Sequence, residues 1–194
     1  MNTEGKRKVI LVTDGDNCAR KTLERAVLNI GGRCISRSSG NPTMLTSPEI
    51  VSLIKEAKND PVVVMVDDRG NTGMGKGEQV MYEISTHPDI EVLGIVAVAS
   101  NTKGVRGVKV DYSIDNDGNV IDGPVDKHGN RTIKNLLYGD TVDIIDNCKV
   151  PIVIGVGDIG KMEGKDVKEI GAPIITKALE HIISKNSSDN EYRL

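Results

Sequence analysis

Short apolar runs alternate along the chain with segments of helical spacing. The runs that predict buried strands cover residues 8–13, 33–37, 61–66, 90–99 and 150–156. Apolar positions recur every three or four residues, as in amphipathic helices, over residues 18–30, 48–57, 78–86 and 173–183. Strands that alternate with helices are typical of right-handed βαβ units. We therefore predict an α/β fold with an open, mainly parallel five-stranded sheet, ordered 2-1-3-4-5 or close to it, in a flavodoxin- or Toprim-like three-layer sandwich.

The region between the fourth and fifth strands departs from this rhythm. Apolar residues alternate with polar ones from Val108 to Ile114, an Asp-Asn-Asp-Gly turn follows at residues 115–118, and Val120 resumes the apolar pattern. This pattern predicts a β-hairpin inserted at about residues 104–131. Short helices are expected at residues 132–138 and 141–147. We predict a single domain over residues 1–194, with its core at about 8–185 and a frayed tail at 186–194.

Composition limits the possible functions. The 194 residues contain no Phe or Trp, so the core must be aliphatic, which suits buried parallel strands. Lys and Arg number 25, Asp and Glu number 28, and the two signs are interspersed. Without a basic stripe or clustered aromatic residues, the chain lacks the features of a nucleic-acid-binding protein. Three cysteines without metal-site spacing are expected to be reduced thiols of an intracellular protein.

Neither a membrane span nor a signal peptide is expected. The longest apolar run, near residues 92–99, is far shorter than the roughly 18 residues that a spanning helix needs. The first eight residues are polar and charged, and no apolar segment with a cleavage site follows them. Contact with a membrane is therefore expected only through a partner.

Acidic residues follow two of the predicted strands. In open parallel sheets, ligands bind beyond the carboxyl ends of the strands, where the strand order reverses. Asp14 and Asp16 follow the first strand, and Asp67 and Asp68 follow the third. Adjacent first and third strands would bring four carboxylates together, which favours binding of a divalent cation, Mg²⁺ or Ca²⁺. The alternative remains that these aspartates only form turns and cap helices.

Other polar residues and glycines are expected at the same edge of the sheet. The candidates for a ligand- or anion-binding loop are Ser38, Asn41, Gly73, Gly75, Ser100, Gly157 and Asp158. The glycine-rich segment 72–77 does not have the spacing of a P-loop. Residues 155–160 match G-x-G-x-x-G, but no helix opens there and no acidic residue ends a following strand, so NAD binding is rejected.

Several segments, taken in order, resemble one family. They are residues 9–16, residues 31–36 with 39–43, residues 66–70 with the glycine-rich loop, and residues 155–162. This order resembles stage V sporulation protein AE, in its soluble form, from spore-forming Firmicutes. The resemblance implies a role in sporulation and spore germination, beside operon partners that move dipicolinic acid, as its calcium chelate, across the inner membrane of the spore. It implies a location in the forespore or spore, either soluble or peripheral at that membrane. It supplies no catalytic or cofactor-binding residue.

Two functions follow from these observations. The favoured one is a non-enzymatic accessory protein of the dipicolinic acid system, which acts through contacts with proteins of the same operon or with a ligand. The other is a Mg²⁺-dependent phosphoryl-transfer domain, phosphatase-like or receiver-like. Asp14, Asp16, Ser100 and Asp158 are similar to the motifs of haloacid-dehalogenase-like phosphatases, but residues 17–18 are not the Gly-Thr of that motif. A receiver domain would use Asp67 or Asp68 with Ser100 and Lys161.

Overall fold

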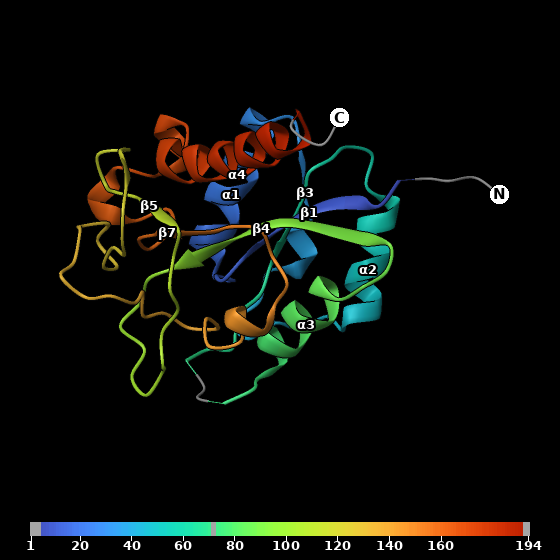
Figure 1. The fold of residues 1–194 in the computed structure, drawn as a ribbon, viewed down its shortest axis with the longest axis horizontal. Coiled ribbons are helices and arrows are strands. Elements are labelled where there is room, and N and C mark those ends of the chain that lie inside the picture. Colours follow the sequence, from blue (N-terminus) through green and yellow to red (C-terminus); the bar gives the residue numbers. More distant parts are fainter. Residues whose placement is uncertain (1–4, 71–72, 192–194) are drawn as a thin grey trace.

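The computed structural model describes residues 5–70 and 73–191 and contains one seven-stranded sheet (Figure 1). Its spatial order is β2-β3-β1-β4-β7-β5-β6, and every pair of neighbours is parallel except β5 and β6. The strands are β1 (Arg7–Val12), β2 (Arg33–Cys34), β3 (Val62–Met65), β4 (Ile90–Val98), β5 (Tyr112–Ile114), β6 (Val120–Ile121) and β7 (Val153–Val156). The expectation of an open, mainly parallel sheet is confirmed.

The predicted number and order of strands are wrong. Strand β3 lies between β2 and β1, so the five predicted strands follow the order 2-3-1-4-5 instead of 2-1-3-4-5. The predicted hairpin exists, but β5 also pairs in parallel with β7, where Tyr112 faces Ile154. The hairpin therefore extends the sheet by two strands and makes it mixed. Hydrophobic spacing identifies a strand but carries little information about which neighbour it pairs with.

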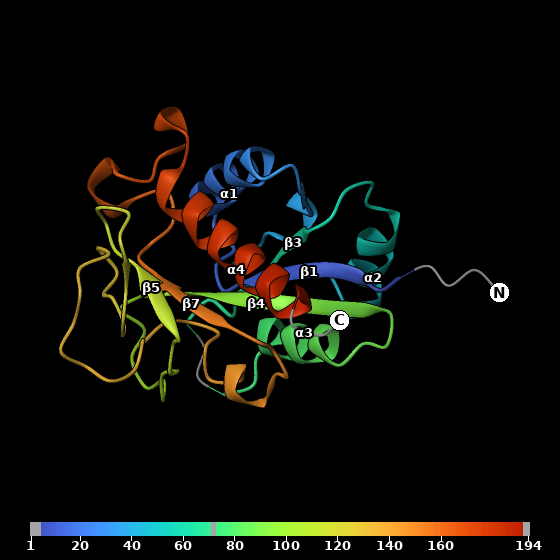
Figure 2. The same ribbon diagram turned by 45° about the horizontal axis from the view of Figure 1, so that its top comes forward.

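Four helices cover the two faces of the sheet (Figures 1 and 2). Helices α1 (Asn17–Asn29) and α4 (Pro173–Glu191) pack together on one face, while α2 (Ser47–Glu56) and α3 (Lys76–Ser85) cover the other. Strand β1 shows how the sheet divides its side chains: Val9 and Leu11 face α2 and α3, whereas Ile10 and Val12 face α1 and α4. All four are fully buried, as expected for a central parallel strand covered on both sides. Within the described residues, no helix is both long and apolar enough to cross a membrane.

Two predicted helices are replaced by irregular backbone. Residues 132–138 form no helix, because Leu137 pairs with Val108 in an isolated β-bridge and Ile133 is fully exposed. Of the helix expected at residues 141–147, only a 3₁₀ turn at Ile145–Asn147 forms. Apolar residues recur in both segments because loop residues, such as Leu137 and Val142, pack in the core against the sheet.

The ends of other elements also differ from the predictions. Strand β2 has only two residues before a 3₁₀ turn at Ser36–Ser38, and β7 begins at Val153 instead of residue 150. The tail predicted to fray from residue 186 continues helix α4 through Glu191. The Asn186 amide anchors it by donating hydrogen bonds to the carbonyl oxygens of Leu93 and Ile182, at 2.9 and 2.8 Å. Residues 192–194 lie outside the described part of the chain.

Candidate functional site

The carboxyl ends of β1 and β3 form the centre of a polar pocket. The two strands are neighbours, with Val12 paired to Met65, as the predicted site requires. The chain leaves β1 toward α1 on one face and leaves β3 toward α3 on the other, which is the reversal at which α/β sheets bind ligands. A cavity of about 280 Å³ opens here. Its charged lining residues are Asp14, Asp16, Asp67, Arg69, Asp140, Asp158 and Lys161.

Asp14 is one of the buried acids of the pocket. Only 8% of the residue is exposed, and its Oδ1 accepts a hydrogen bond of 3.2 Å from the backbone amide of Asp16. Burial, followed by the nearby carboxylates of Asp16, Asp158 and Asp67, raises the pKa of Asp14 to about 8, against the hydrogen bond from the Asp16 amide, which lowers it. Asp14 is therefore mainly protonated at neutral pH unless a cation replaces its proton.

Asp67 and Asp140 form a carboxyl pair in the same pocket. Burial, followed by the proximity of Asp140, raises the pKa of Asp67 to about 7, against a 2.6 Å hydrogen bond from the Arg69 amide to Asp67 Oδ1. Asp140 is fixed from two sides: its carboxylate accepts a hydrogen bond from the Gly70 amide, and its own amide donates to Ser100 Oγ at 3.1 Å. The pair can share a proton or bind a cation between its oxygens.

Lys161 neutralises the remaining two acids. Its Nζ lies 2.9 Å from Asp16 Oδ2 and 3.0 Å from Asp158 Oδ1. These two carboxylates raise the pKa of Lys161 despite its partial burial. Although burial opposes it, the pKa of Asp16 is lowered by hydrogen bonds from the Ala19 amide, at 2.8 Å, and from Lys161. Asp16 also caps the start of α1, so the mouth of the pocket holds a fixed ion-pair network.

Asp68 does not line the pocket. Its two carboxylate oxygens accept hydrogen bonds from the amides of Gly77, at 2.6 Å, and Glu78, at 2.9 Å, at the start of α3. Burial raises the pKa of Asp68 against these two bonds. Gly75 packs on the same carboxylate, where a Cβ would lie 2.2 Å from Asp68 Oδ1. Gly75 and Gly77 thus lie against Asp68, and this aspartate follows the capping alternative of the sequence analysis.

The structure divides the other candidate residues into two groups. Asn41, Ser100 and Asp158 line the pocket. Ser38 is buried behind it, where its hydroxyl donates to the Ile35 carbonyl and accepts from the Met65 amide, so it holds the loop after β2 against β3. Gly73, Gly75 and Gly157 do not line the pocket. At Gly157 a Cβ would lie 2.6 Å from the Gly129 amide, so its role is to admit a neighbouring loop.

Asp140 is the main site residue that the sequence analysis missed. It lies 73 positions after Asp67, in an irregular segment without hydrophobic periodicity. The sequence signal that could have indicated Asp140 is the glycine before it. Gly139 lets this loop approach the end of β4 closely, because a Cβ there would lie 2.1 Å from the Val98 carbonyl oxygen. Among residues 5–70 and 73–191, no group of three or more His, Cys, Asp or Glu side chains is arranged so that it could hold a metal ion.

Comparison with known proteins places the chain in a family. No curated protein and no solved structure matches it. The family model described as stage V sporulation protein AE1 matches residues 8–186, a range that includes every residue lining the acidic pocket. The chain therefore belongs to the stage V sporulation protein AE1 family and is a sporulation-related protein.

Proposed function

We propose that the chain is a non-enzymatic accessory protein of the dipicolinic acid transport system of the spore, and that its acidic pocket binds calcium dipicolinate. Family membership supports the sporulation role. The acidic pocket at the ends of β1 and β3 is the observation that supports binding of the ligand. The protein acts in the forespore or spore, either soluble or held at the inner membrane by a protein of the same operon.

The acids of the pocket suit a cation that brings some of its own ligands. Lys161 neutralises Asp16 and Asp158, which leaves Asp14, Asp67 and Asp140 for the ligand. Burial raises the pKa of Asp14 and Asp67, so a divalent cation would displace protons from them. Ca²⁺ takes about six to eight oxygen ligands. A dipicolinate chelate supplies carboxylate oxygens of its own, so its calcium ion needs fewer protein carboxylates than a bare ion, which fits a pocket whose described residues form no group of three metal-binding side chains.

Thermal unfolding with added ligand tests this proposal. Calcium dipicolinate should raise Tm by mass action, and CaCl₂, MgCl₂ or dipicolinate alone should raise it less. Asp67→Asn should remove the rise. Asp146→Asn changes the charge equally at an exposed position outside the pocket and should retain it. Equal stabilisation of the two variants, or none in the unmodified protein, would contradict ligand binding in this pocket.

The accessory role makes a separate prediction in cells. Any association of the protein with the spore membrane should disappear when its operon partner is deleted, because contact with the membrane is proposed to occur through that partner. Fractionation of spores that lack each protein of the operon in turn measures this. Membrane association that survives every deletion would contradict a partner-mediated attachment.

The phosphoryl-transfer alternative has one favourable observation. Asp14, Asp67, Ser100 and Lys161 line the same pocket from the ends of four neighbouring strands. However, Lys161 is engaged by Asp16 and Asp158, and the raised pKa of Asp14 makes it a poor nucleophile at neutral pH. Hydrolysis of p-nitrophenyl phosphate with Mg²⁺ distinguishes the functions. The accessory role predicts no turnover, whereas turnover that Asp67→Asn or Asp14→Asn abolishes would support phosphoryl transfer.

A further inference from the structure

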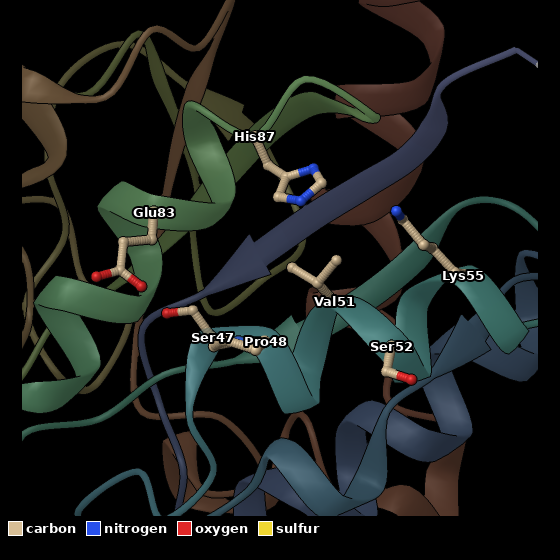
Figure 3. Close-up of a pocket in the computed structure, with 7 residues that line it drawn as sticks. All are labelled: Ser47, Pro48, Val51, Ser52, Lys55, Glu83 and His87. Atoms are coloured by element: carbon tan, nitrogen blue, oxygen red, sulfur yellow. The ribbon is translucent and has the colours of Figure 1, made fainter.

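A second cavity, the α2–α3 groove, lies between these two helices (Figure 3). Its volume is about 430 Å³, in the range of sites that bind small ligands or peptide segments. Its lining residues are Ser47, Pro48, Val51, Ser52, Lys55, Glu83 and His87. None of them lines the acidic pocket, so the groove is a separate site.

The middle of the groove is apolar and fixed. Pro48 and Val51 form this part from α2, and Val51 is only 9% exposed because it also packs in the core. The start of α2 is held by a capping box, in which Glu49 Oε2 accepts hydrogen bonds from the amide and hydroxyl of Thr46 at 2.7 and 2.8 Å. A segment that binds here meets a preformed surface.

One end of the groove is anionic. Glu83 Oε1 accepts a 2.9 Å hydrogen bond from Nε2 of the Gln79 side chain. The Ser47 hydroxyl, together with Gln79, lowers the pKa of Glu83, so its carboxylate stays ionised at neutral pH. Figure 3 shows the Glu83 carboxylate and the Ser47 hydroxyl at the same end of the groove, away from Lys55.

The other end offers hydrogen-bond donors. His87 Nδ1 accepts a hydrogen bond from the Asp89 amide at 3.2 Å, so Nε2 is the ring nitrogen that can donate. Lys55 Nζ lies 2.5 Å from Asp89 Oδ2, so the ammonium group is held at this end. An acidic group that enters here can accept from His87 and share the Lys55 ammonium group with the Asp89 carboxylate.

We propose that the α2–α3 groove binds a short, extended segment of a partner protein. The segment carries a basic side chain at the Glu83 end, an apolar side chain over Pro48 and Val51, and an acidic side chain at the end formed by Lys55 and His87. Ser47 and Lys55 are eight residues apart on α2, or about 12 Å along its axis. An extended chain advances about 3.3 Å per residue, so about four residues span the groove, and a free amino acid is too short to reach both ends.

Titration of the ¹⁵N-labelled protein with designed peptides tests the proposal. The probe is acetyl-Lys-Leu-Ser-Glu-amide, and the neutral control is acetyl-Gln-Leu-Ser-Gln-amide. Amide shifts should be confined to α2 and to α3 with the residues just after it. The charged peptide should bind about threefold to tenfold more tightly, as two partly exposed ion pairs would give. Equal affinities, or shifts outside the groove, would overturn the proposal.

Variants identify the contacts. Glu83→Lys should reverse the preference, so that acetyl-Glu-Leu-Ser-Glu-amide binds more tightly than the probe. Glu180→Lys, an equal change at an exposed position of α4 on the opposite face, should leave it unchanged. Both positions are exposed, and the same spectra report whether each variant is folded. Free leucine that produced the same shifts with equal affinity would overturn the peptide assignment. The acidic pocket shares no residue with the groove, so failure here leaves the proposed function standing, and the reverse also holds.

Discussion

Asp14 should make the folded protein less stable as the pH rises. Burial and the neighbouring acids raise the pKa of Asp14 from 3.8 to about 8. Below about pH 4 the group is protonated in both the folded and the unfolded chain, and its effect cancels. Between about pH 4 and pH 8 the unfolded chain loses this proton while the folded chain keeps it, so the free energy of unfolding falls with pH. Above about pH 8 the loss is complete.

The structure sets an upper limit on this effect. Each pKa unit corresponds to about 1.4 kcal/mol, so a shift from 3.8 to about 8 gives at most about 6 kcal/mol. Water and side chains rearrange around a buried charge, which reduces the observed cost, and we expect about 2 kcal/mol between pH 5 and pH 9. Asp14→Asn keeps the shape of the side chain without its charge. The variant should therefore be more stable than the unmodified protein at pH 9 and similar to it at pH 5.

Urea unfolding followed by circular dichroism, with a chelator present, measures both curves. Asp16→Asn is the control, because the pKa of Asp16 is lowered and the stability from its ionised form is lost only in acid. Its curve should lie below that of the unmodified protein from pH 5 to pH 9, with a shallower slope, because the Asp16 carboxylate no longer raises the pKa of Asp14. Asp67 and Glu78, each with a pKa raised to about 7, should leave some slope in every curve. Parallel curves for Asp14→Asn and the unmodified protein would refute the assignment of a buried, protonated Asp14.

Substitutions at three further positions test the packing and the caps, each by chemical unfolding. Met81→Ala, at a fully buried position of α3, should cost about 2–5 kcal/mol, whereas Met81→Leu should cost less than about 1.5 kcal/mol. Asp166→Ala should cost about 1–2 kcal/mol, because the buried carboxylate accepts hydrogen bonds from the backbone amides of Ile174 and Ile175 at the start of α4, at 2.8 and 3.1 Å. Gly77→Ala should cost about 1–3 kcal/mol, because its Cβ would lie 2.7 Å from the Asp67 carbonyl oxygen. A change below about 0.5 kcal/mol for Met81→Ala, Asp166→Ala or Gly77→Ala would contradict the local geometry at that position.

The strands of the core could be predicted because their signals are local, whereas the pairing of β1 with β3 was expected only from the assumed order of the strands. Runs such as residues 9–12 and 62–65 are uniformly aliphatic and end in turn-forming acids, which marks a buried strand and the edge where it stops. The position of β3 between β2 and β1 depends on how far each connecting helix carries the chain sideways. Residue spacing does not contain that information, so the order of the strands was wrong.

The adjacency of Asp67 and Asp68 in the chain was a signal that the prediction of the site did not use. Successive residues of an extended chain point to opposite sides. Asp67 and Asp68 therefore could not both enter the pocket, and Asp68 turns to the amides at the start of α3. Asp140 is a different case. It reaches the pocket from a loop whose path is set by contacts with β4 and with Ser100, which no local pattern encodes.

The two outer strands of the sheet affect how this protein behaves at high concentration. An open sheet ends in unpaired backbone groups that can recruit a strand from another molecule. Here one border is Arg33–Cys34 and the other is Val120–Ile121, each only two residues long. So short a border offers an incoming chain too few hydrogen bonds to offset the entropy of ordering it. The fold thus keeps an open sheet while resisting growth into fibrils or edge-to-edge aggregates.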